Sequence, residues 1–389
     1  MFRLPLYAIL LLCGFACNRP HPAEAVDASV TEAREDSIAL AAAYAGQALI
    51  ERSVLATVET AVARATNLED AADDPAIWIH PTDPARSLVF GSNKTSGLAA
   101  YNLAGEEVAY YEIGNVNNVD ILTEVPLAGE RITLLGASNR TNQAVDLYRV
   151  DEESGALTNI ADGILAVDST KVDDIYGFCL ARAGERVYAI ANGKNGMLQQ
   201  YELEEREGAF GLRLVREHAF PSQTEGMVAD NDLGWLYVGE EAAGIWKLPL
   251  VPEASAGAAV DTDKEPGIRL LNDRVGRPES LVADVEGLTL YQRPGGGGYL
   301  VASMQGNFSY ALFDRAGDNA YLGSFKITDA AVDGVEETDG LEVVSAPLPG
   351  YPGGLLVVQD GFNFDGDTLR PQNFKYVDFG RVLEAVETK

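Results

Sequence analysis

Residues 225–241 read E-G-M-V-A-D-N-D-L-G-W-L-Y-V-G-E-E. Glu225 and a glycine lead into an apolar run, and a second apolar run ends on Glu240 and Glu241. The intervening D-L-G-W is a turn sequence, and two apolar runs joined by such a turn predict a β-hairpin. Acids therefore stand at both same-side ends of this predicted hairpin.

The same pattern, a polar residue followed by a small or turn-forming residue and an apolar run, recurs along the chain. The six polar positions are Asp74, Asp120, Tyr176, Glu225, Glu286 and Asp339. They are separated by 46, 56, 49, 61 and 53 residues, and short Val-, Ile-, Leu- and aromatic-rich runs fill the intervals. Six units of this kind predict an all-β fold, a six-bladed β-propeller with about four antiparallel strands per blade.

A second polar position follows each of these residues by 16 to 21 positions, at the end of the next strong apolar run. These second positions are Lys94, Arg140, Lys194, Glu241, Gln305 and Asp360. Because neighbouring strands of a blade are antiparallel, the start of one strand and the end of the next lie on the same face. All twelve positions are therefore predicted to ring one end of the central channel.

This predicted ring is divided by charge. The second positions of the first three units are cations, whereas those of the last three are acids or an amide. Further acids stand beside the first positions, namely Asp73, Glu240, Asp284 and Asp333. Carboxylate, amide and phenolic oxygens without His or Cys favour Ca²⁺ over zinc or copper. Several calcium ions opposite Lys and Arg would bind a polyanion such as phosphate, and a purely structural calcium site is the alternative.

The whole chain is strongly acidic. Its 389 residues have a formal net charge of −30, and 47% of them are apolar, which is enough for a large core. Phosphate backbones and anionic membranes are bound by basic surfaces, so this charge argues against nucleic acid or membrane as the main partner.

Other phosphatase chemistries lack their residues. The chain has three histidines and no R-H-G-x-R-x-P stretch, and the position six residues after Cys179, where a cysteine phosphatase has Arg, is Glu185. Neither a P-loop nor a G-x-S-x-G motif is present. If the protein is an enzyme, metal-bound water is the expected nucleophile.

The N-terminus is typical of an exported protein. Residues 1–17 have one early positive charge, an apolar run of about a dozen residues and a small-residue end, as in a signal peptide. We expect either plain secretion or a bacterial lipoprotein lipidated at Cys17, located in the periplasm, outside the cell or at the outer membrane. Residues 18–56 are predicted to be a polar, Ala-rich spacer, and residues 57–389 the propeller domain.

Ordered motifs between about Glu59 and Arg381 resemble those of the β-propeller (alkaline) phytases. They include D-D-P-A-I-W, N-K-T-S-G-L-A-A-Y, N-N-V-D, S-Q-T-E-G-M, D-V-E-G-L-T and Q-N-F-K. The resemblance implies a six-bladed propeller that needs Ca²⁺ for stability and activity. It also implies a 3-phytase-like phosphoric monoester hydrolase that releases phosphate from phytate, myo-inositol hexakisphosphate, by direct attack of calcium-activated water.

The resemblance also implies roles for single residues. The calcium ligands would be Glu59, Asp74, Tyr176, Glu225, Glu241, Asp284, Glu286, Gln305 and Asp339, with Asp333 in a related site. The catalytic centre would consist of Tyr176, Glu225, Asp284, Glu286 and Asp339. The phosphate-binding cations would be Lys94, Arg140 and Lys194. The chain departs from the family at Thr95, where a second lysine is frequent.

The expected substrate is phytate or another inositol polyphosphate, taken as its calcium salt by a monomeric protein. Two alternatives remain, a non-catalytic calcium-binding surface propeller and another metal-dependent propeller hydrolase such as a lactonase. The row formed by Lys94, Arg140 and Lys194 argues against a lactonase, which would have an apolar pocket.

Overall fold

The computed structural model describes residues 37–66, 68–252, 269–271 and 281–387. The predicted signal peptide with Cys17 and the first half of the predicted spacer, to residue 36, lie outside the described residues. The chain divides into two compact units, residues 1–41 and 42–389, and the fold below is that of the second. Within the described ranges, no helix is long and apolar enough to cross a membrane.

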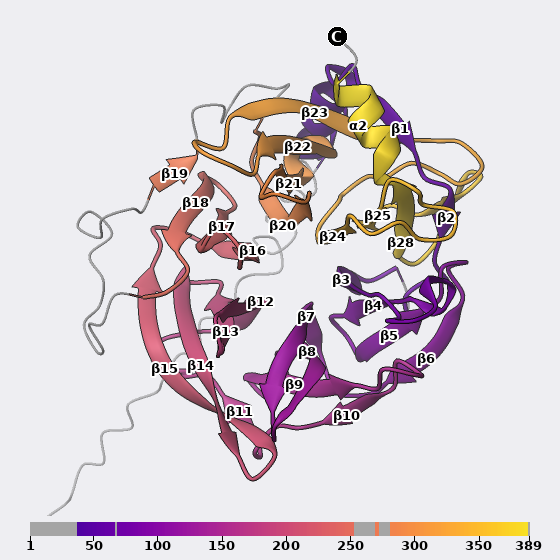
Figure 1. Cartoon of the computed structure of the whole chain (residues 1–389). Coiled ribbons are helices and arrows are strands. Elements are labelled where there is room, and N and C mark those ends of the chain that lie inside the picture. The colour runs from indigo at the N-terminus through magenta and orange to yellow at the C-terminus, as the bar shows by residue number, and fades with distance from the viewer. Residues whose placement is uncertain (1–36, 67, 253–268, 272–280, 388–389) are drawn as a thin grey trace, which may run out of the picture. The chain divides into compact units, whose positions relative to one another are not determined.

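Six β-sheets of the second unit are arranged in a ring, as Figure 1 shows, so the predicted six-bladed β-propeller is confirmed. The first blade consists of β3 (Ala72–Trp78), β4 (Leu88–Asn93), β5 (Gly97–Tyr101) and β6 (Glu107–Tyr111). The second consists of β7 (Val116–Leu127), β8 (Glu130–Asn139), β9 (Ala144–Val150) and β10 (Leu157–Asn159), with β11 (Leu165–Ala166) also paired to β9. The third consists of β12 (Ile175–Ala183), β13 (Arg186–Gly193), β14 (Met197–Arg206) and β15 (Ala209–Ala219).

The remaining blades follow the same order. The fourth consists of β16 (Thr224–Asp230), β17 (Trp235–Glu240), β18 (Gly244–Pro249) and β19 (Arg269–Leu271). The fifth consists of β20 (Val285–Gln292), β21 (Gly298–Met304), β22 (Ser309–Asp314) and β23 (Tyr321–Thr328). The sixth has β24 (Leu341–Val344), β25 (Leu355–Asp360) and β28 (Asn373–Asp378). Short elements complete the chain: η1 (Pro84–Arg86), η2 (Gln305–Asn307), β26 (Phe364–Asp365), β27 (Thr368–Leu369) and α2 (Phe379–Glu387).

The sixth blade is closed by a strand from the other end of the chain. Strand β2 (Val58–Glu59) pairs antiparallel with β28, with Val58 opposite Tyr376 and Glu59 opposite Lys375. Strand β1 (Ser53–Leu55) pairs in parallel with β23 of the fifth blade, within the range predicted to be a spacer. Joining both chain ends in one sheet closes the ring, which leaves no open first or last blade.

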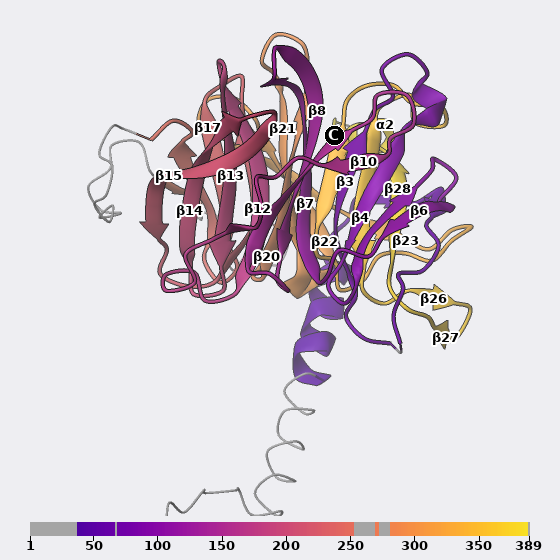
Figure 2. The same cartoon turned by 90° about the horizontal axis from the view of Figure 1, so that it is seen from below.

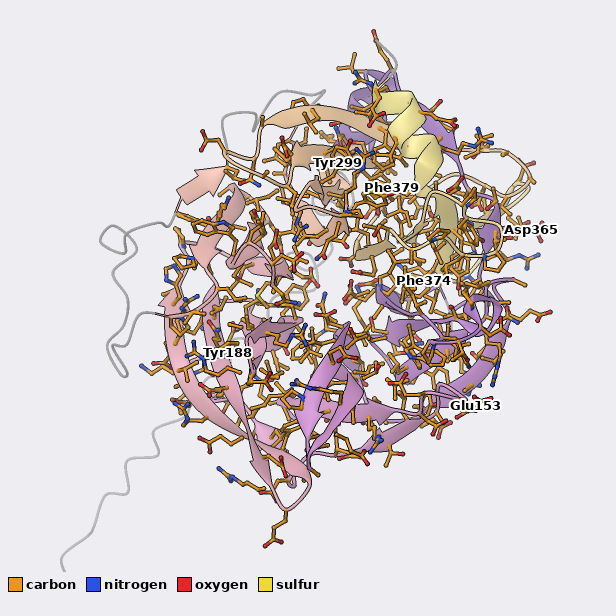
Figure 3. The ribbon with its side chains drawn as sticks, in the orientation of Figure 1. Glu153, Tyr188, Tyr299, Asp365, Phe374 and Phe379 are labelled. Carbon is orange, nitrogen blue, oxygen red and sulfur yellow. The ribbon has the colours of Figure 1, made fainter. Side chains whose placement is uncertain are left out.

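Large aromatic side chains fill the spaces between blades. Phe374 of the sixth blade packs on Tyr101 of the first, with ring centres 6.1 Å apart. A Cβ added to Gly91 would lie 2.4 Å from the Phe374 ring, so only glycine fits opposite it. Figure 3 labels Phe374 and, on α2, Phe379, whose ring stacks on Tyr291 of the fifth blade at 4.4 Å. These contacts pack the sixth blade against the first, and α2 against the fifth blade.

The first strand of each blade lies nearest the centre of the ring, as Figure 1 shows, and in the first five blades its pairing with the second strand begins with an irregular step; Figure 2 shows the same strands from the side. In the fourth blade Thr224 pairs with Glu240, and regular pairing resumes three residues later between Met227 and Val238. The same shift occurs at the start of β3, β7, β12 and β20. In each blade we call the residue two positions before the start of regular pairing the inner-ring position. The six inner-ring positions are Asp73, Asn117, Tyr176, Glu225, Glu286 and Asp339.

Four of these six inner-ring positions are those predicted from the sequence. In the first two blades the prediction was displaced, because Asp73 and Asn117 occupy the positions assigned to Asp74 and Asp120. The displacement is one residue in the first blade and three in the second. It changes which side chain reaches the rim, namely Asp73 in place of Asp74, and an amide, Asn117, in place of the Asp120 carboxylate.

The second ring position is confirmed in five blades by a repeated main-chain hydrogen bond. The N–H groups of Lys94, Arg140, Lys194, Glu241 and Gln305 donate to the carbonyls of Ala71, Asn115, Asp174, Gln223 and Asp284. Each acceptor lies two residues before an inner-ring position. The inner-ring position and the second polar position of each of these blades are therefore at the same end of the channel. In the sixth blade Gly361 donates instead, to the Glu336 carbonyl at 2.9 Å, and the predicted position at Asp360 is one residue early.

The segment before β1 packs against the loops that follow β21 and β23. The Tyr44 hydroxyl donates to Glu336 Oε2 at 2.5 Å, and the Tyr44 ring meets the Phe308 ring edge-on at 5.3 Å. Gln47 Nε2 donates to the Phe308 carbonyl at 3.3 Å. Phe308 follows η2 and has a left-handed backbone with φ of 50°. These contacts support the turn that contains Gln305.

Replacing Gly46 by leucine is expected to destabilise the protein by about 1–3 kcal/mol, a shift of a few degrees in Tm. A Cβ at this position would lie 2.9 Å from the Asn307 Cβ, so a larger side chain must displace η2. Ala45→Leu is the matched control, because Ala45 is an exposed residue of the same helical segment. Thermal unfolding checks this, and equal Tm values for the two variants would contradict the close packing.

Candidate functional site

Acids from four blades meet at the rim of the channel. Asp73 of β3, Glu225 of β16 and Asp339, just before β24, each place a carboxylate oxygen within 4.8 Å of the others. Glu225, Glu241 and Glu286 form a second group within the same distance. We call these the first and second acid groups. Glu225 belongs to both groups, so it lies where a bridging ligand would be needed.

The acid groups have the properties of a metal site. Among the described residues, no partner donates to either oxygen of Asp73 or to Oε2 of Glu225 and Glu286. These three side chains are 0%, 2% and 6% exposed. Burying several carboxylates close together with so few hydrogen bonds is strongly disfavoured unless further positive charge is present. Divalent cations would remove this cost, and a donor set consisting only of oxygens fits Ca²⁺.

The pKa values of these acids reflect the same crowding. Burial, followed by the charge of Asp339, raises the pKa of Asp73, Glu225 and Glu286. Burial also raises the pKa of Glu241. The ionised forms of these carboxylates therefore need added positive charge nearby.

Three other predicted ligands lie at the same rim. Burial raises the pKa of the Tyr176 phenol, and the charge of Glu225 raises it further, so the hydroxyl is neutral. The main-chain N–H of Gln305 donates to the Asp284 carbonyl at 2.9 Å, which joins these two residues of the fifth blade. Gln305 also lines a pocket of about 420 Å³ together with Asp339 and Glu337. The structure therefore brings together every predicted catalytic residue.

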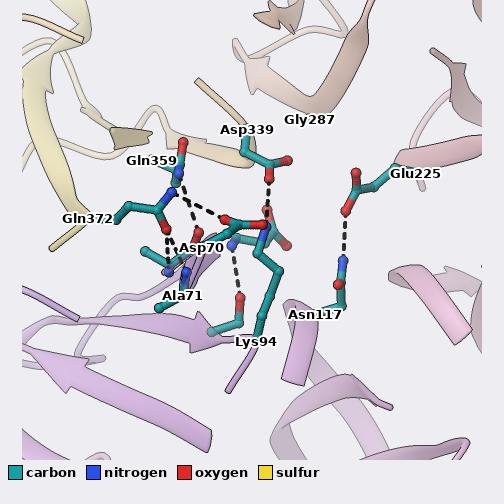
Figure 4. Close-up of polar contacts among 12 residues, drawn as sticks. Asp70, Ala71, Lys94, Asn117, Glu225, Gly287, Asp339, Gln359 and Gln372 are labelled. Atoms are coloured by element: carbon teal, nitrogen blue, oxygen red, sulfur yellow. Dashed lines mark hydrogen bonds and ion pairs between the residues drawn. The ribbon is translucent and has the colours of Figure 1, made fainter. Parts of the chain in front are cut away.

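The three predicted phosphate-binding cations come from the first three blades, and the first of them lies beside the first acid group. Lys94 Nζ lies 2.7 Å from Asp70 Oδ2 and 3.3 Å from Asp339 Oδ2, as Figure 4 shows. Burial by itself lowers the Lys94 pKa, but the charges of Asp73 and Asp339 raise it overall. Lys94 thus adjoins the first acid group directly.

The other two cations are held by different neighbours. Arg140 Nη2 donates to Asp174 Oδ2 at 2.5 Å, and this bond raises the pKa of the guanidinium. Lys194 Nζ lies 4.6 Å from the centre of the Tyr176 ring, within the range of a cation–π contact. Both positive groups are therefore oriented before any ligand binds.

Asp74, a predicted ligand, lies deeper in the channel than either acid group. Its Oδ2 accepts from the Val119 N–H at 3.1 Å, and its own N–H donates to Ser92 Oγ at 2.8 Å. It lines a cavity of about 20 Å³ with Asp120 and Glu342, room for about one water molecule. Asp73 occupies the position in the first acid group that the sequence assigned to Asp74.

Glu59 and Asp333, also predicted as ligands, meet in a different pocket of about 740 Å³ beside the closing strand β2. The fully buried ammonium of Lys375 contacts Asp333 Oδ1, Glu59 Oε2 at 2.7 Å and Asp360 Oδ2 at 3.3 Å. Lys375 thus supplies a fixed positive charge among three acids. A metal ion bound by Glu59 and Asp333 would share their oxygens with this lysine.

A family model described as phytase matches residues 25–389 of the chain. The chain belongs to the β-propeller phytase family. It is 41% identical over 324 residues to a 3-phytase of Bacillus subtilis (strain 168), with 81% of each chain covered. The predicted family is thereby confirmed, and the protein is a phytase-like hydrolase.

Among solved structures, this phytase-family chain is similar to the β-propeller domain of Cps50 (Swd1) from Myceliophteria thermophila. That likeness has a TM-score of 0.43 and 11% identity, and it covers 79% of this chain and 83% of the other.

Several residues of the site were not assigned a role from the sequence. Asp70 and Asp174 form ion pairs with Lys94 and Arg140, two of the three predicted phosphate-binding cations, and Asn117 contacts Glu225 from across the channel. The signal for Asn117 was present in the doubled N-N of residues 117–118, which parallels the D-D of residues 73–74. In both pairs the first residue faces the rim, and the N–H of the second donates to a serine of the next strand.

Proposed function

We propose that this phytase-family hydrolase releases phosphate from phytate in a calcium-dependent reaction. The main support is that two buried acid groups sharing Glu225 lie on the same rim as Lys94, Arg140 and Lys194. Metal ions held by the acids and the three cations would together form a positive site inside an acidic protein. A multiply phosphorylated substrate matches such a site in charge.

The two acid groups would each hold one ion, with Glu225 as the shared ligand and Tyr176, Asp284 and Gln305 as further oxygen donors. Bound calcium would supply charge to bind a phosphate and to lower the pKa of the attacking water. Neither acid group contains a histidine or cysteine within the described part of the chain, which favours direct attack by water. Water would then add to phosphorus as the bond to the inositol oxygen breaks, and the proton that the water loses would pass to that leaving oxygen.

The cations would bind and orient the substrate. Lys94, beside Asp339, can contact a phosphoryl oxygen at the edge of the first acid group. Arg140 and Lys194, on the next two blades, can bind the phosphate on a neighbouring inositol carbon. Substrates with adjacent phosphates should therefore be preferred, and we propose that they enter as calcium salts and that the protein acts as a monomer. The name of the Bacillus subtilis relative, 3-phytase, supports phytate as the substrate.

Phosphate release from phytate by the purified protein tests this proposal. We expect release with millimolar Ca²⁺, its loss after chelation, and its return when Ca²⁺ but not Mg²⁺ is added, because Mg²⁺ needs a small octahedral site. A single-phosphate substrate such as glycerol phosphate should be hydrolysed with lower kcat/KM. Equal release with and without calcium would refute the metal-dependent reaction.

A further inference from the structure

One inner-ring position differs in chemistry from the other five. Asp73, Glu225, Glu286 and Asp339 are acids and Tyr176 is a phenol, whereas β7 places an amide, Asn117, at the rim. Asn117 is fully buried. Its Nδ2 donates to Glu225 Oε1 at 2.7 Å, as Figure 4 shows. This bond crosses the channel from the second blade to the fourth.

The orientation of the Asn117 amide is determined by its two acceptors. Nδ2 donates to Glu225 Oε1 and also to Asn118 Oδ1 at 2.9 Å. A flipped amide would place Oδ1 against two other oxygens, which is repulsive. Oδ1 therefore points elsewhere and has no partner among the residues that the structure describes. The amide acts towards Glu225 as a donor only.

The hydrogen bond from Asn117 makes the two carboxylate oxygens of Glu225 different. Oε1 accepts from Asn117, whereas Oε2 has no donor within the described ranges. Glu225 is the member common to both acid groups, so the direction of its carboxylate decides whether both can share it. Without the amide, the carboxylate could rotate away from neighbours that repel it.

We propose that Asn117 is a positioning residue, whose amide fixes the carboxylate of Glu225 as the shared ligand of the two acid groups. This inference rests on the proposed function, because it assumes that those groups hold cations. Residues that hydrogen-bond to a metal ligand and orient it contribute strongly to metal affinity, and their loss typically weakens metal binding by about 10- to 100-fold. An amide suits this task because it donates a hydrogen bond without adding negative charge to a crowded cluster.

A double-mutant cycle with Glu225→Gln tests the inference. Calcium affinity is measured by titration calorimetry on the wild type, Asn117→Ala, Glu225→Gln and the double variant. We expect Asn117→Ala to weaken calcium binding by about tenfold, and to weaken it no further when Glu225 is already glutamine. Additive effects of the two substitutions would overturn the inference, since Asn117 would then act independently of Glu225.

Asn117→Asp separates positioning from charge. Aspartate has the same shape but lacks both N–H donors and adds a negative charge beside Glu225. A purely electrostatic role predicts tighter calcium binding, whereas positioning predicts weaker binding and a lower kcat with excess calcium. Because this variant is nearly isosteric, it remains informative if Asn117→Ala fails to fold.

Gln200→Ala is the matched control. Gln200 is also fully buried, with one bond from Nε2 to the Leu250 carbonyl at 3.0 Å and, among the described residues, no donor to Oε1. It lies on β14, outside both acid groups, so its loss should lower Tm without changing calcium affinity. If the wild type binds calcium and Asn117→Ala binds it with the same affinity, the inference about Asn117 is refuted but the proposed function is not. A wild type that binds no calcium would refute the proposed function itself.

Discussion

Replacing Glu225 by alanine is expected to reduce the rate of phosphate release from phytate by about 100- to 1,000-fold. Glu225 is 2% exposed and is shared by both acid groups, so its loss removes one ligand from each. The fold should survive in excess calcium, because the change also removes a charge from a cluster of mutually repelling acids. Steady-state kinetics and circular dichroism at saturating calcium measure the two effects.

A matched acid far from the rim serves as the control for this variant. Glu185 lies at the turn between β12 and β13, at the opposite end of the third blade from Tyr176, and its side chain is 72% exposed. Glu185→Ala should retain wild-type turnover. Unchanged turnover in Glu225→Ala would mean that neither acid group takes part in the reaction.

Removal of calcium is expected to lower Tm by roughly 10 °C. Each site filled at a hundredfold excess over its Kd contributes about 2.7 kcal/mol, so two sites contribute about 5 kcal/mol, and a domain of this size shifts by about 2 °C per kcal/mol. The physical reason is that Asp73, Glu225 and Glu286 are buried close together and repel one another. Calorimetry in Ca²⁺ and in EDTA provides the measurement.

The same calorimetry can locate the effect. The calcium-dependent rise in Tm should be smaller in Glu225→Ala than in the wild type, whereas Glu185→Ala should show the full rise. Identical Tm values in Ca²⁺ and EDTA for the wild type would show that the acids at the rim hold no stabilising ion.

The fold was predictable because six similar units repeat their polar landmarks at similar spacing. The hairpin predicted at residues 225–241 is β16 and β17, and its two ends meet at the rim as expected. In the third to sixth blades a glycine follows the inner-ring residue, which marks its position. In the first two blades Asp74 and Asn118 replace that glycine, so the pattern placed the rim residue at Asp74 instead of Asp73 and at Asp120 instead of Asn117.

Contacts between distant residues could not be read from the sequence. Lys375 lies among Glu59, Asp333 and Asp360, although Glu59 precedes it by 316 residues. Nothing in the local sequence around Lys375 indicates a buried cation, because its partners belong to other strands and loops. The bond from Asn117 to Glu225 is hidden for the same reason, since it depends on how the ring places two blades across a channel.

The pairing of β2 with the sixth blade also determines when during synthesis that blade can fold. The sixth blade combines residues 58–59 with residues 341–378, so it cannot exist until almost the whole chain has been synthesised. Contacts between such distant segments make folding slow, and five finished blades meanwhile expose two unpaired sides. Asp73 comes from the first blade and Asp339 from the sixth, so the first acid group assembles only when the ring closes.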